Sequence, residues 1–213
     1  MTAADVAAGA RALGVELSAE QADQLAGYAG LLRRWNTVYN LTAIDSASDV
    51  LTHHLLDSLS IVPHFLKKLD NKDARVLDVG SGGGLPGIPL AIAFPSLRVT
   101  LLDKVGKKAA FLLQAKVELG LANVEVVHGR VEDYRPVQPF DAIVSRAFAA
   151  LGDFVALTGH LLAPTGFWAA MKGPAADDER AGLPAAVRVS EDIPLTVPGL
   201  AAERRLLILE RTP

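Results

Sequence analysis

The sequence contains no cysteine, which excludes disulfide bonds, metal sites built on cysteine and cysteine nucleophiles. No apolar run reaches the ~18 residues that a membrane-spanning helix needs. The first residues, MTAADVAAGARALG, have no cationic stretch before an apolar core. Its histidines and carboxylates are not spaced as metal ligands usually are. We therefore expect a soluble cytoplasmic protein, acting as a monomer and without a bound metal.

The chain has no excess of positive charge. Its formal net charge is −3 at pH 7 and its pI is about 5.9, so any contact with nucleic acid must depend on local basic patches. Two clusters are candidates, although a solvated charged face is the more frequent role of such clusters. The first is Lys104, Lys107 and Lys108, and the second is Lys67, Lys68, Lys72 and Arg75.

Two patterns divide the chain near residue 70. Residues 1–70 have helical periodicity, whereas apolar strands alternate with helices in residues 71–213. A chain of 213 residues, 50% of them hydrophobic, is long enough for one good core and a small second unit. No linker rich in glycine, proline or serine separates the two parts. We therefore expect the helical segment to pack on the main domain.

The helical segment has clear start and stop signals. Ser18 and Gln21 have the spacing of a capping box, and Gly14 ends the alanine-rich stretch before them. The expected helices are Ala3 to Leu13, a second helix that runs to about Tyr39 and, after a break over Asn40 to Asp45, an apolar helix through His54, Leu55, Leu59 and Ile61 that Pro63 ends or bends.

The alternation after residue 75 predicts an α/β fold with a mostly parallel sheet. The expected strands are Arg75 to Val79, Arg98 to Leu102, Val124 to His128, Asp141 to Ser145, Gly166 to Met171, Val187 to Ile193 and Arg205 to Leu209. The expected helices between them are Ile88 to Phe94, Lys107 to Gly120 and Asp153 to Leu162. The last two strands have too short a connection for a parallel crossover, so we expect a terminal antiparallel hairpin.

The most informative segment is D-V-G-S-G-G-G-L-P-G, Asp78 to Gly87, between an apolar strand and a helix start. Glycines at such a turn bring the backbone against a ligand, and the helix that follows offers it unpaired N–H groups. Asp103 follows Gly80 by 23 residues at the end of the next strand, close to the ~20-residue offset at which an acidic residue meets a ribose. Strand, loop and acid together predict a nucleoside cofactor.

The glycines fit two cofactor patterns. Gly82, Gly84 and Gly87 match G-x-G-x-x-G, which favours a dinucleotide and hence an NAD-linked oxidoreductase. Asp78 with Gly80, Gly82 and Gly84 matches D-x-G-x-G-x-G, which resembles the first motif of class I methyltransferases that use S-adenosylmethionine. We favour the second interpretation, with a Rossmann-like sheet. A module that binds the cofactor and RNA without catalysis stays open as a further alternative.

The absence of two kinds of catalytic residue reduces the number of possible methyl acceptors. Without cysteine, the covalent attack used in pyrimidine C5 methylation is excluded, and the chain has no N-P-P-Y or D-P-P-Y tetrapeptide of the kind used on exocyclic amines. Guanine N7 has a free lone pair and needs no general base. Its recognition needs donors to O6, a task suited to arginine or lysine. Arg146 follows a strand at the edge where such sheets bind ligands.

The chain resembles the RsmG (GidB) family of small-subunit ribosomal RNA guanine-N7 methyltransferases along nearly its whole length. The matching segments are W-N-T-V-Y-N-L-T-A-I (35–44), H-L-L-D-S (54–58), V-L-D-V-G-S-G-G-G-L-P-G-I-P-L-A-I (76–92), V-T-L-L-D-K-V-G-K-K-A-A-F-L (99–112), N-V-E-V-V-H-G-R-V-E-D (123–133), F-D-A-I-V-S-R-A-F (140–148), M-K-G (171–173) and E-R (203–204). This resemblance implies methyl transfer from S-adenosylmethionine to 16S ribosomal RNA or the small subunit.

The resemblance also implies roles for individual residues. Cofactor contacts are expected at Gly80, Leu85, Asp103, Val131, Glu132 and Arg146, and we add the loop residues Ser81, Gly82, Gly84 and Pro86. Arg146, Lys172 and Arg204 are expected to face the RNA or the target base, with Asn40 and His54 on the methyl-transfer side. Alternatives stay open for five of these residues: Asp103 as a helix cap, His54 as a packing partner, Glu132 as a solvated carboxylate, and Arg146 and Lys172 as surface residues.

Overall fold

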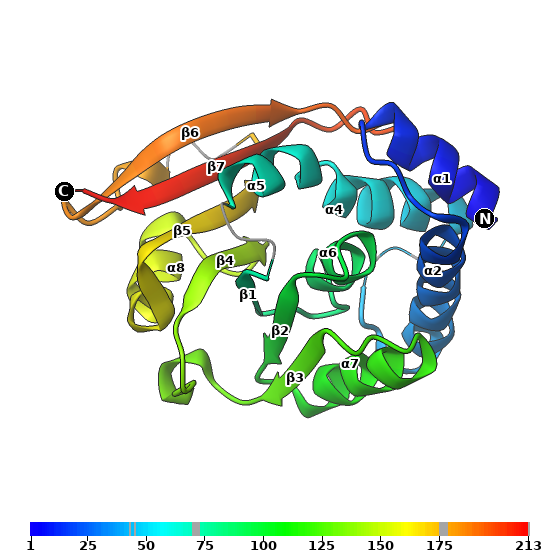
Figure 1. Cartoon of the computed structure of the whole chain (residues 1–213), viewed down its shortest axis with the longest axis horizontal. Helices are drawn as coiled ribbons and strands as arrows, with labels where there is room; N and C mark the ends of the chain where they lie inside the picture. Colours follow the sequence, from blue (N-terminus) through cyan, green and yellow to red (C-terminus); the bar gives the residue numbers. More distant parts are fainter. Residues whose placement is uncertain (43, 45, 70–72, 175–178, 213) are drawn as a thin grey trace.

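A seven-stranded sheet runs through the molecule in the order β3-β2-β1-β4-β5-β7-β6, with helices on both faces (Figure 1). The computed structural model describes residues 1–42, 44, 46–69, 73–174 and 179–212. The strands are β1 (Arg75–Val79), β2 (Arg98–Asp103), β3 (Val124–His128), β4 (Phe140–Arg146), β5 (Leu162–Lys172), β6 (Val187–Leu195) and β7 (Arg204–Arg211). The first five pair in parallel, and β7 pairs antiparallel with β5 and β6. The expected sheet and terminal hairpin are therefore confirmed.

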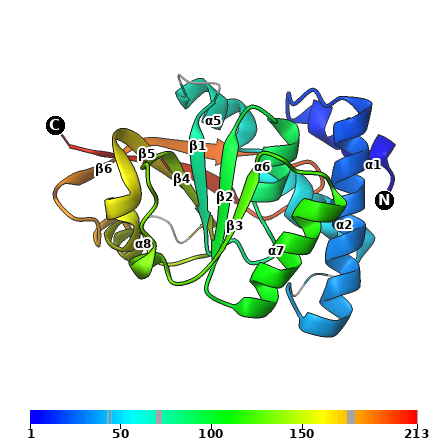
Figure 2. The ribbon, with the colours of Figure 1, turned by 60° about the horizontal axis from the view of Figure 1, so that its bottom comes forward.

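Alternating strand residues fill two separate cores, because successive side chains point to opposite faces. On β1, Val76 belongs to one core and Leu77 to the other, and on β5 Phe167 and Trp168 divide in the same way. The first core lies under α6 (Gly87–Ala93), α7 (Gly106–Glu118) and the N-terminal helices, and the second lies under α8 (Leu151–Thr158). Figure 2 shows α8 on the opposite side of the sheet from α6 and α7.

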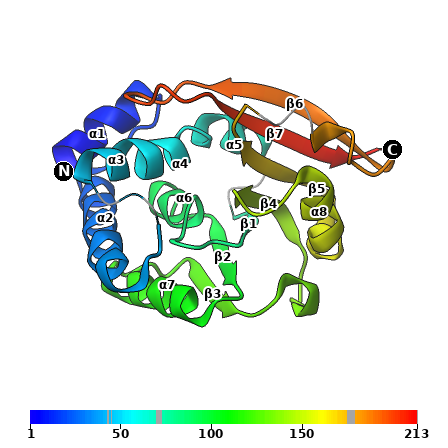
Figure 3. The ribbon, with the colours of Figure 1, turned by 180° about the vertical axis from the view of Figure 1, so that it is seen from behind.

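The N-terminal helices pack around the first core. They are α1 (Ala3–Ala12), α2 (Ala19–Tyr39), α3 (Ala47–Asp49), α4 (Asp57–Leu59) and α5 (Val62–Lys68). Thr2 and Ser18 both form capping boxes, at the starts of α1 and α2. Buried residues of α1, α2 and α5 share one cluster with β1 and β2, and Figure 3 shows α2 alongside α7. The division of the chain near residue 70 stays a prediction, since the core continues across it.

The third expected helix is not one regular helix. Between α3 and α4 the chain forms a π-helix, η1, over Val50–Leu56. Ser60 and Ile61 then interrupt the helical run, and Pro63 lies in the first turn of α5. Proline fits there because the first turn of a helix leaves its N–H groups unpaired. The helical run is thus broken directly before Pro63, as expected, and Pro63 then lies in the first turn of the next helix, which begins at Val62. Ala43 and Asp45 of the expected break lie outside the described residues.

Helix and strand limits differ from expectation mainly around β5. The helix expected over 153–162 is α8 followed by the 3-10 turn η3 (Gly159–Leu161), and β5 begins at Leu162. The pairing of β4 with β5 is irregular between Phe140 and Ala142, whose partners are Leu162 and Phe167. A bulge of this kind keeps a strand going through Pro164 and Gly166, residues that otherwise indicate a turn.

Candidate functional site

The loop after β1 and the end of β4 lie at the switch point of the sheet, where β2 and β4 flank β1 on opposite sides. Two neighbouring cavities open there. The first has a volume of about 330 Å³ and the second of about 600 Å³. Gly80, Lys108 and Ala147 line both of them. The two cavities are therefore adjacent, and together they form one site with two compartments.

The smaller compartment, here called the β2–β3 cavity, contains the residues expected to hold a nucleoside. Asp103, Val131 and Glu132 line it together with Gly80 and Phe148. Val131 and Glu132 come from the 3-10 turn η2 (Val131–Asp133), which follows β3. The lining is mainly apolar around a few polar groups, as in many small-molecule sites. The structure thus brings together the residues that the sequence predicted at the nucleoside site. Their contacts to a cofactor stay a prediction.

The larger compartment, here called the arginine cavity, contains four of the residues expected on the acceptor side. They are His54, Arg146, Lys172 and Arg204, and the loop residues Ser81, Gly82 and Leu85 line the same space. Asn40, Gly84 and Pro86 line neither cavity. Asn40 instead ends α2 in a left-handed conformation, with its N–H bonded to the Asn36 carbonyl. The roles expected for these three residues therefore stay predictions, and the described cavity linings do not include them.

The glycine loop is held by hydrogen bonds to the strand ends. The N–H groups of Gly80 and Ser81 donate to the Leu102 carbonyl at 2.9 and 3.1 Å. The Gly82 N–H donates to the Asp103 carboxylate at 2.9 Å, and the other oxygen of that carboxylate accepts the Val105 N–H at 2.8 Å. Asp103 therefore shapes the loop and holds Val105, the residue before α7, while it lines the β2–β3 cavity. A carboxylate has about four lone-pair sites, so it can accept further donors.

The start of α6 does not offer its N–H groups to a ligand, contrary to the expectation from the sequence. The Gly87 N–H donates to the Asp78 carboxylate at 2.9 Å, and the Ile88 N–H donates to the Gly84 carbonyl at 2.7 Å. Pro89 has no N–H. A dinucleotide pyrophosphate needs such groups free. The structure therefore removes the basis for the G-x-G-x-x-G interpretation.

Asp78 is a fully buried carboxyl group that fixes this helix start. Burial raises the pKa of Asp78 to about 7, although the Gly87 N–H and the Arg146 charge act in the opposite direction. The Ser81 hydroxyl also donates to the Asp78 carbonyl at 2.7 Å. These contacts give Asp78 a structural role at the start of α6.

Tyr28 links the N-terminal helices to the glycine loop. It is fully buried on α2, and its hydroxyl donates a hydrogen bond to the Gly83 carbonyl. Burial raises the pKa of the Tyr28 phenol, so the phenol keeps the proton that it donates. A residue of the helical segment therefore helps to set the conformation of the loop.

The substitution Tyr28→Phe should loosen the loop and weaken cofactor binding. Loss of one hydrogen bond costs about 1 kcal/mol, so we expect the Kd for S-adenosylmethionine to rise about fivefold. Calorimetric titration measures this change. Tyr39→Phe, at the more exposed end of the same helix, is the matched control. Equal affinities of Tyr28→Phe and wild type would contradict a role for Tyr28 in the loop.

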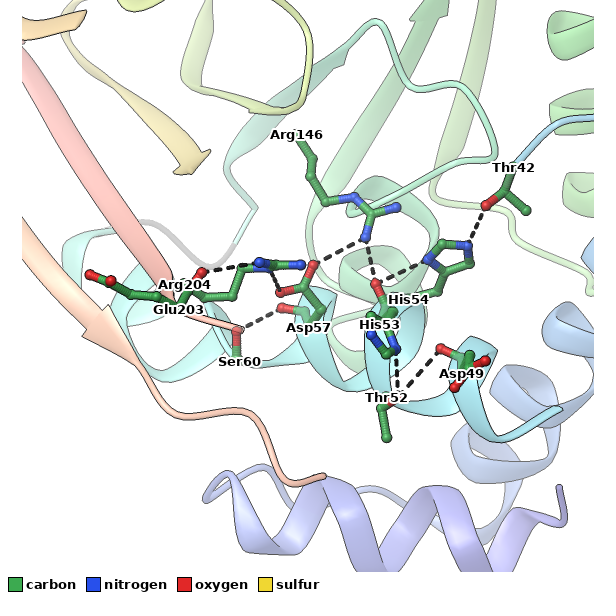
Figure 4. A network of polar contacts seen from close by, with 10 residues as sticks. All are labelled: Thr42, Asp49, Thr52, His53, His54, Asp57, Ser60, Arg146, Glu203 and Arg204. Carbon is green, nitrogen blue, oxygen red and sulfur yellow. Dashed lines mark hydrogen bonds and ion pairs between the residues drawn. The ribbon is translucent and has the colours of Figure 1, made fainter. Parts of the chain in front are cut away.

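Two arginines meet at one buried carboxylate in the arginine cavity (Figure 4). Arg146 Nη1 lies 3.1 Å from Asp57 Oδ2, and Arg204 Nε lies 3.2 Å from Asp57 Oδ1. Asp57 is 1% exposed. The arginines come from the ends of β4 and β7, and the carboxylate comes from α4. Three distant parts of the chain thus build one polar cluster.

Lys172 is held in the same cavity by different partners. Its Nζ atom donates to the Ala149 carbonyl at 2.7 Å and pairs with Glu179 at 2.7 Å. The Glu179 carboxylate also accepts the Leu151 N–H at 2.8 Å, and it thereby caps the first turn of α8. The described lining has four cationic side chains, Lys108, Arg146, Lys172 and Arg204, against Asp57 and Glu179. The cavity is therefore locally positive in a chain that is acidic overall.

His54 lies beside this cluster as a neutral imidazole. Burial and then the Arg146 charge lower the pKa of His54 to about 4. Its Nδ1 is 3.0 Å from the His53 carbonyl, so Nδ1 is the donor, and Nε2 accepts from the Thr42 hydroxyl at 2.8 Å (Figure 4). Thr42 in turn accepts the Ile44 N–H at 3.1 Å. His54 thereby ties the segment after α2 to the cavity.

The His54 pKa predicts a specific dependence of stability on pH. Between pH values of about 6.5 and 4 the unfolded histidine binds a proton that the native one does not, so this group lowers the free energy of unfolding as pH falls, by at most about 3 kcal/mol. Asp78, whose pKa is raised, acts in the opposite sense. The test is therefore the difference in the free energy of unfolding between wild type and His54→Gln.

That difference should shrink as pH falls from about 6.5 to 4, because glutamine does not titrate and can still bond Thr42. Urea unfolding at several pH values measures it, and His160→Gln, at an exposed histidine, is the control. A difference that does not change with pH would contradict the lowered pKa of His54.

Several residues of the two basic clusters have structural partners. Lys68 is ion-paired with Glu191 and Glu210, and the Arg75 guanidinium lies over the Phe140 ring. Lys107 donates to the Tyr39 carbonyl at 2.9 Å. Lys72 lies outside the described residues. These contacts favour the structural role for the second cluster, while Lys104 and Lys108 line the cavities.

Three residues of the site were not identified from the sequence as site residues: Tyr28, Asp57 and Glu179. Each of them contacts a residue far away in the sequence or a backbone group, and neither kind of contact can be recognised from local sequence. Asp57 lies within the H-L-L-D-S match, which is the one sequence signal that pointed to it.

Neither a metal-binding cluster nor a membrane-spanning helix is present among the residues that the structure describes. No three histidine, aspartate or glutamate side chains there are grouped so that they could hold a metal ion. None of the described helices combines the length and apolar character needed to cross a bilayer.

Known structures share this fold. TrmN from Thermus thermophilus aligns with a TM-score of 0.59 at 18% identity, over 76% of this chain and 53% of that one. A SAM dependent methyltransferase from Aquifex aeolicus aligns with a TM-score of 0.57 at 17% identity, over 80% of this chain and 96% of that one. At such identities the likeness shows the fold alone, a class I methyltransferase sheet.

Sequence comparison goes further than the fold. Residues 21–208 match the family model GidB, described as rRNA small subunit methyltransferase G. The protein named ribosomal RNA small subunit methyltransferase G from Aromatoleum aromaticum is 55% identical over 215 residues, covering 99% of this chain and all of that one. Its namesake from Ectopseudomonas mendocina is 55% identical over 204 residues, 96% of this chain and 94% of that one. With a match along nearly its whole length, the chain belongs to the rRNA small subunit methyltransferase G family.

Proposed function

We propose that this protein transfers a methyl group from S-adenosylmethionine to N7 of a guanine in 16S ribosomal RNA. The observation that carries the proposal is the pair of adjacent cavities at the switch point of the sheet, one lined by Asp103 and Val131 and the other by arginine and lysine side chains. Family membership supports the ribosomal RNA substrate. The choice of N7 depends on the chemistry of the arginine cavity.

The β2–β3 cavity fits the nucleoside part of the cofactor. Asp103 offers a carboxylate with remaining acceptor capacity for ribose hydroxyls, and Val131 and Phe148 offer apolar surface for adenine. Glu132 is paired with Arg130 at 2.7 Å and lies at the rim. The bound cofactor supplies an electrophilic methyl group on a sulfonium. The protein then has to align a nucleophile and exclude water.

The arginine cavity fits an acceptor that needs hydrogen-bond donors and no base. Arg146, Arg204 and Lys172 provide donors, and arginine matches the O6 and N7 edge of guanine. Methylation at N7 uses a lone pair and releases no proton from the ring. His54, whose imidazole accepts from Thr42, is therefore not required as a general base and is proposed to hold the segment around Thr42.

The net positive lining also suits an RNA backbone. Sequence-specific RNA recognition mostly targets unstacked bases in loops and bulges, and a flipped guanine can enter a cavity of this size. Because ribosomal subunits are made in the cytoplasm of bacteria, we place the reaction there. We further propose that the protein acts as a monomer.

The test uses cofactor labelled in its methyl group with naked 16S RNA and, separately, with small ribosomal subunits. After digestion to nucleosides, mass spectrometry should find the label only in 7-methylguanosine. Label on an exocyclic amine, a ribose or a pyrimidine would contradict the choice of N7. Cofactor binding without any transfer to either RNA would support the alternative of a non-catalytic binding module.

A further inference from the structure

Asp57 is a buried carboxylate to which the mechanism above gives no task. It is 1% exposed, and both of its oxygens accept from arginines of the arginine cavity. A buried carboxylate is costly unless it is paired and hydrogen-bonded. Here it has two cationic partners, which come from the end of β4 and the start of β7, two strands that β5 separates in the sheet. It therefore joins two arginines that no other described contact brings together.

The π-helix η1 supplies a second anchor for Arg146. In an α-helix the Asp57 N–H would donate to the His53 carbonyl, four residues earlier. Instead it donates to the carbonyls of Thr52 and His54. The His53 carbonyl accepts Arg146 Nη1 at 2.8 Å and His54 Nδ1 at 3.0 Å. The change of helix type thus presents a backbone acceptor to the cavity, as π-helical turns often do at functional sites.

Both anchors hold the same atom of the Arg146 guanidinium. Nη1 donates to the His53 carbonyl and to Asp57 Oδ2. Within the described part of the chain, Nε and Nη2 of Arg146 have no hydrogen-bond partner, and Figure 4 shows Nη2 turned away from Asp57. A guanidinium is planar and rigid, so fixing one nitrogen and its neighbours fixes where the remaining donors point.

We propose that Asp57 is a positioning residue, which, together with the His53 carbonyl, holds Arg146 and Arg204 so that their free donors face the acceptor base. The inference rests on the proposed function, because it assigns those donors to the methyl acceptor. Asp57 also neutralises one of the two guanidinium charges, which lets the arginines lie close together. A positioned donor loses little freedom when the acceptor binds.

The substitution Asp57→Asn keeps the shape of the side chain and removes its charge. We expect kcat for transfer to RNA to fall about 30-fold, within the range of about 100-fold that a small misplacement can cost. Asp192→Asn is the matched control, since Asp192 also pairs with two arginines, Arg180 and Arg205, but lines neither cavity. It should transfer methyl groups like wild type. A kcat for Asp57→Asn equal to that of the control would overturn the proposal.

A double-mutant cycle separates positioning from a general structural role. In an Arg204→Gln background, adding Asp57→Asn to Arg146→Ala should lower kcat by less than about threefold if Asp57 acts through the two arginines, because both groups to be positioned are already gone. A structural role would multiply the two effects, and that result would overturn the proposal. If Asp57→Asn alone does not fold, this cycle still tests the proposal, because Asp57→Asn with Arg204→Gln removes one charge of each sign.

A readout without turnover keeps the inference apart from the proposed function. In protein labelled with ¹⁵N-arginine, rotation of the Arg146 guanidinium should be slow in wild type and in Asp192→Asn, and fast in Asp57→Asn. Fast rotation already in wild type would overturn the anchoring. A wild type with slow rotation that transfers no methyl group to RNA would instead contradict the proposed function and leave the anchoring intact.

Discussion

Arg146→Ala is expected to lower kcat/KM for methyl transfer by about 100- to 1,000-fold, the loss typical when a preorganised donor is removed. Arg146 ends β4 at the edge of the sheet where both cavities meet, and its neighbour Ala147 lines both. Its guanidinium is anchored by Asp57 and by the His53 carbonyl. Transfer of labelled methyl groups to RNA measures the change.

The control for this prediction is Arg188→Ala, at an exposed arginine of β6 that pairs with Glu210. It should have wild-type turnover. Arg146→Lys should be nearly as impaired as Arg146→Ala, because an ammonium has no planar fork that can hold two anchors and still face the base. Turnover of Arg146→Ala within about threefold of wild type would remove this residue from the site.

Gly84→Ala should lower the free energy of unfolding by about 3 kcal/mol, through two effects. Gly84 has a φ of +84°, which costs alanine about 1 kcal/mol or more. A Cβ atom there would also lie 2.5 Å from Ile88 Cδ1 and 3.0 Å from Leu112 Cδ2, and overpacking of a core costs about 1–3 kcal/mol. Urea unfolding without cofactor measures the sum.

Gly120→Ala separates the two effects. Gly120 also has a left-handed φ, +65°, but a Cβ atom there would meet nothing within 4 Å. We expect a loss of only about 1 kcal/mol. Equal losses for the two variants would show that packing beneath the loop is not the reason for glycine at position 84.

The parallel sheet could be predicted from the sequence because its strands are short apolar runs between turn residues. The structure has β1 and β3 at the expected limits, Arg75–Val79 and Val124–His128. The terminal hairpin followed from the shortness of its connection. The start of β5 did not, because the bulge that admits Pro164 and Gly166 is set by pairing with β4. Local sequence carries no signal for such a partner.

Sequence reasoning placed the strand-end residues of the site more successfully than the helical ones. The carboxyl ends of parallel strands meet at one edge, and this brought Gly80, Arg146 and Lys172 to one cavity. Asp57 lies 89 residues from Arg146 and 147 from Arg204 along the chain. Apolar periodicity does not distinguish a π-helix from an α-helix over so short a stretch. The anchoring cluster therefore needed the three-dimensional structure.

The account depends on the glycine loop and the β2–β3 cavity binding a methyl-donating nucleoside. Isothermal titration calorimetry of the folded protein tests this most directly, with S-adenosylmethionine, its demethylated product and NAD as separate titrants. The account predicts saturable binding of one molecule of either sulfur nucleoside and no binding of NAD. Absence of heat with both sulfur nucleosides at several temperatures, or saturable binding of NAD in their place, would contradict it.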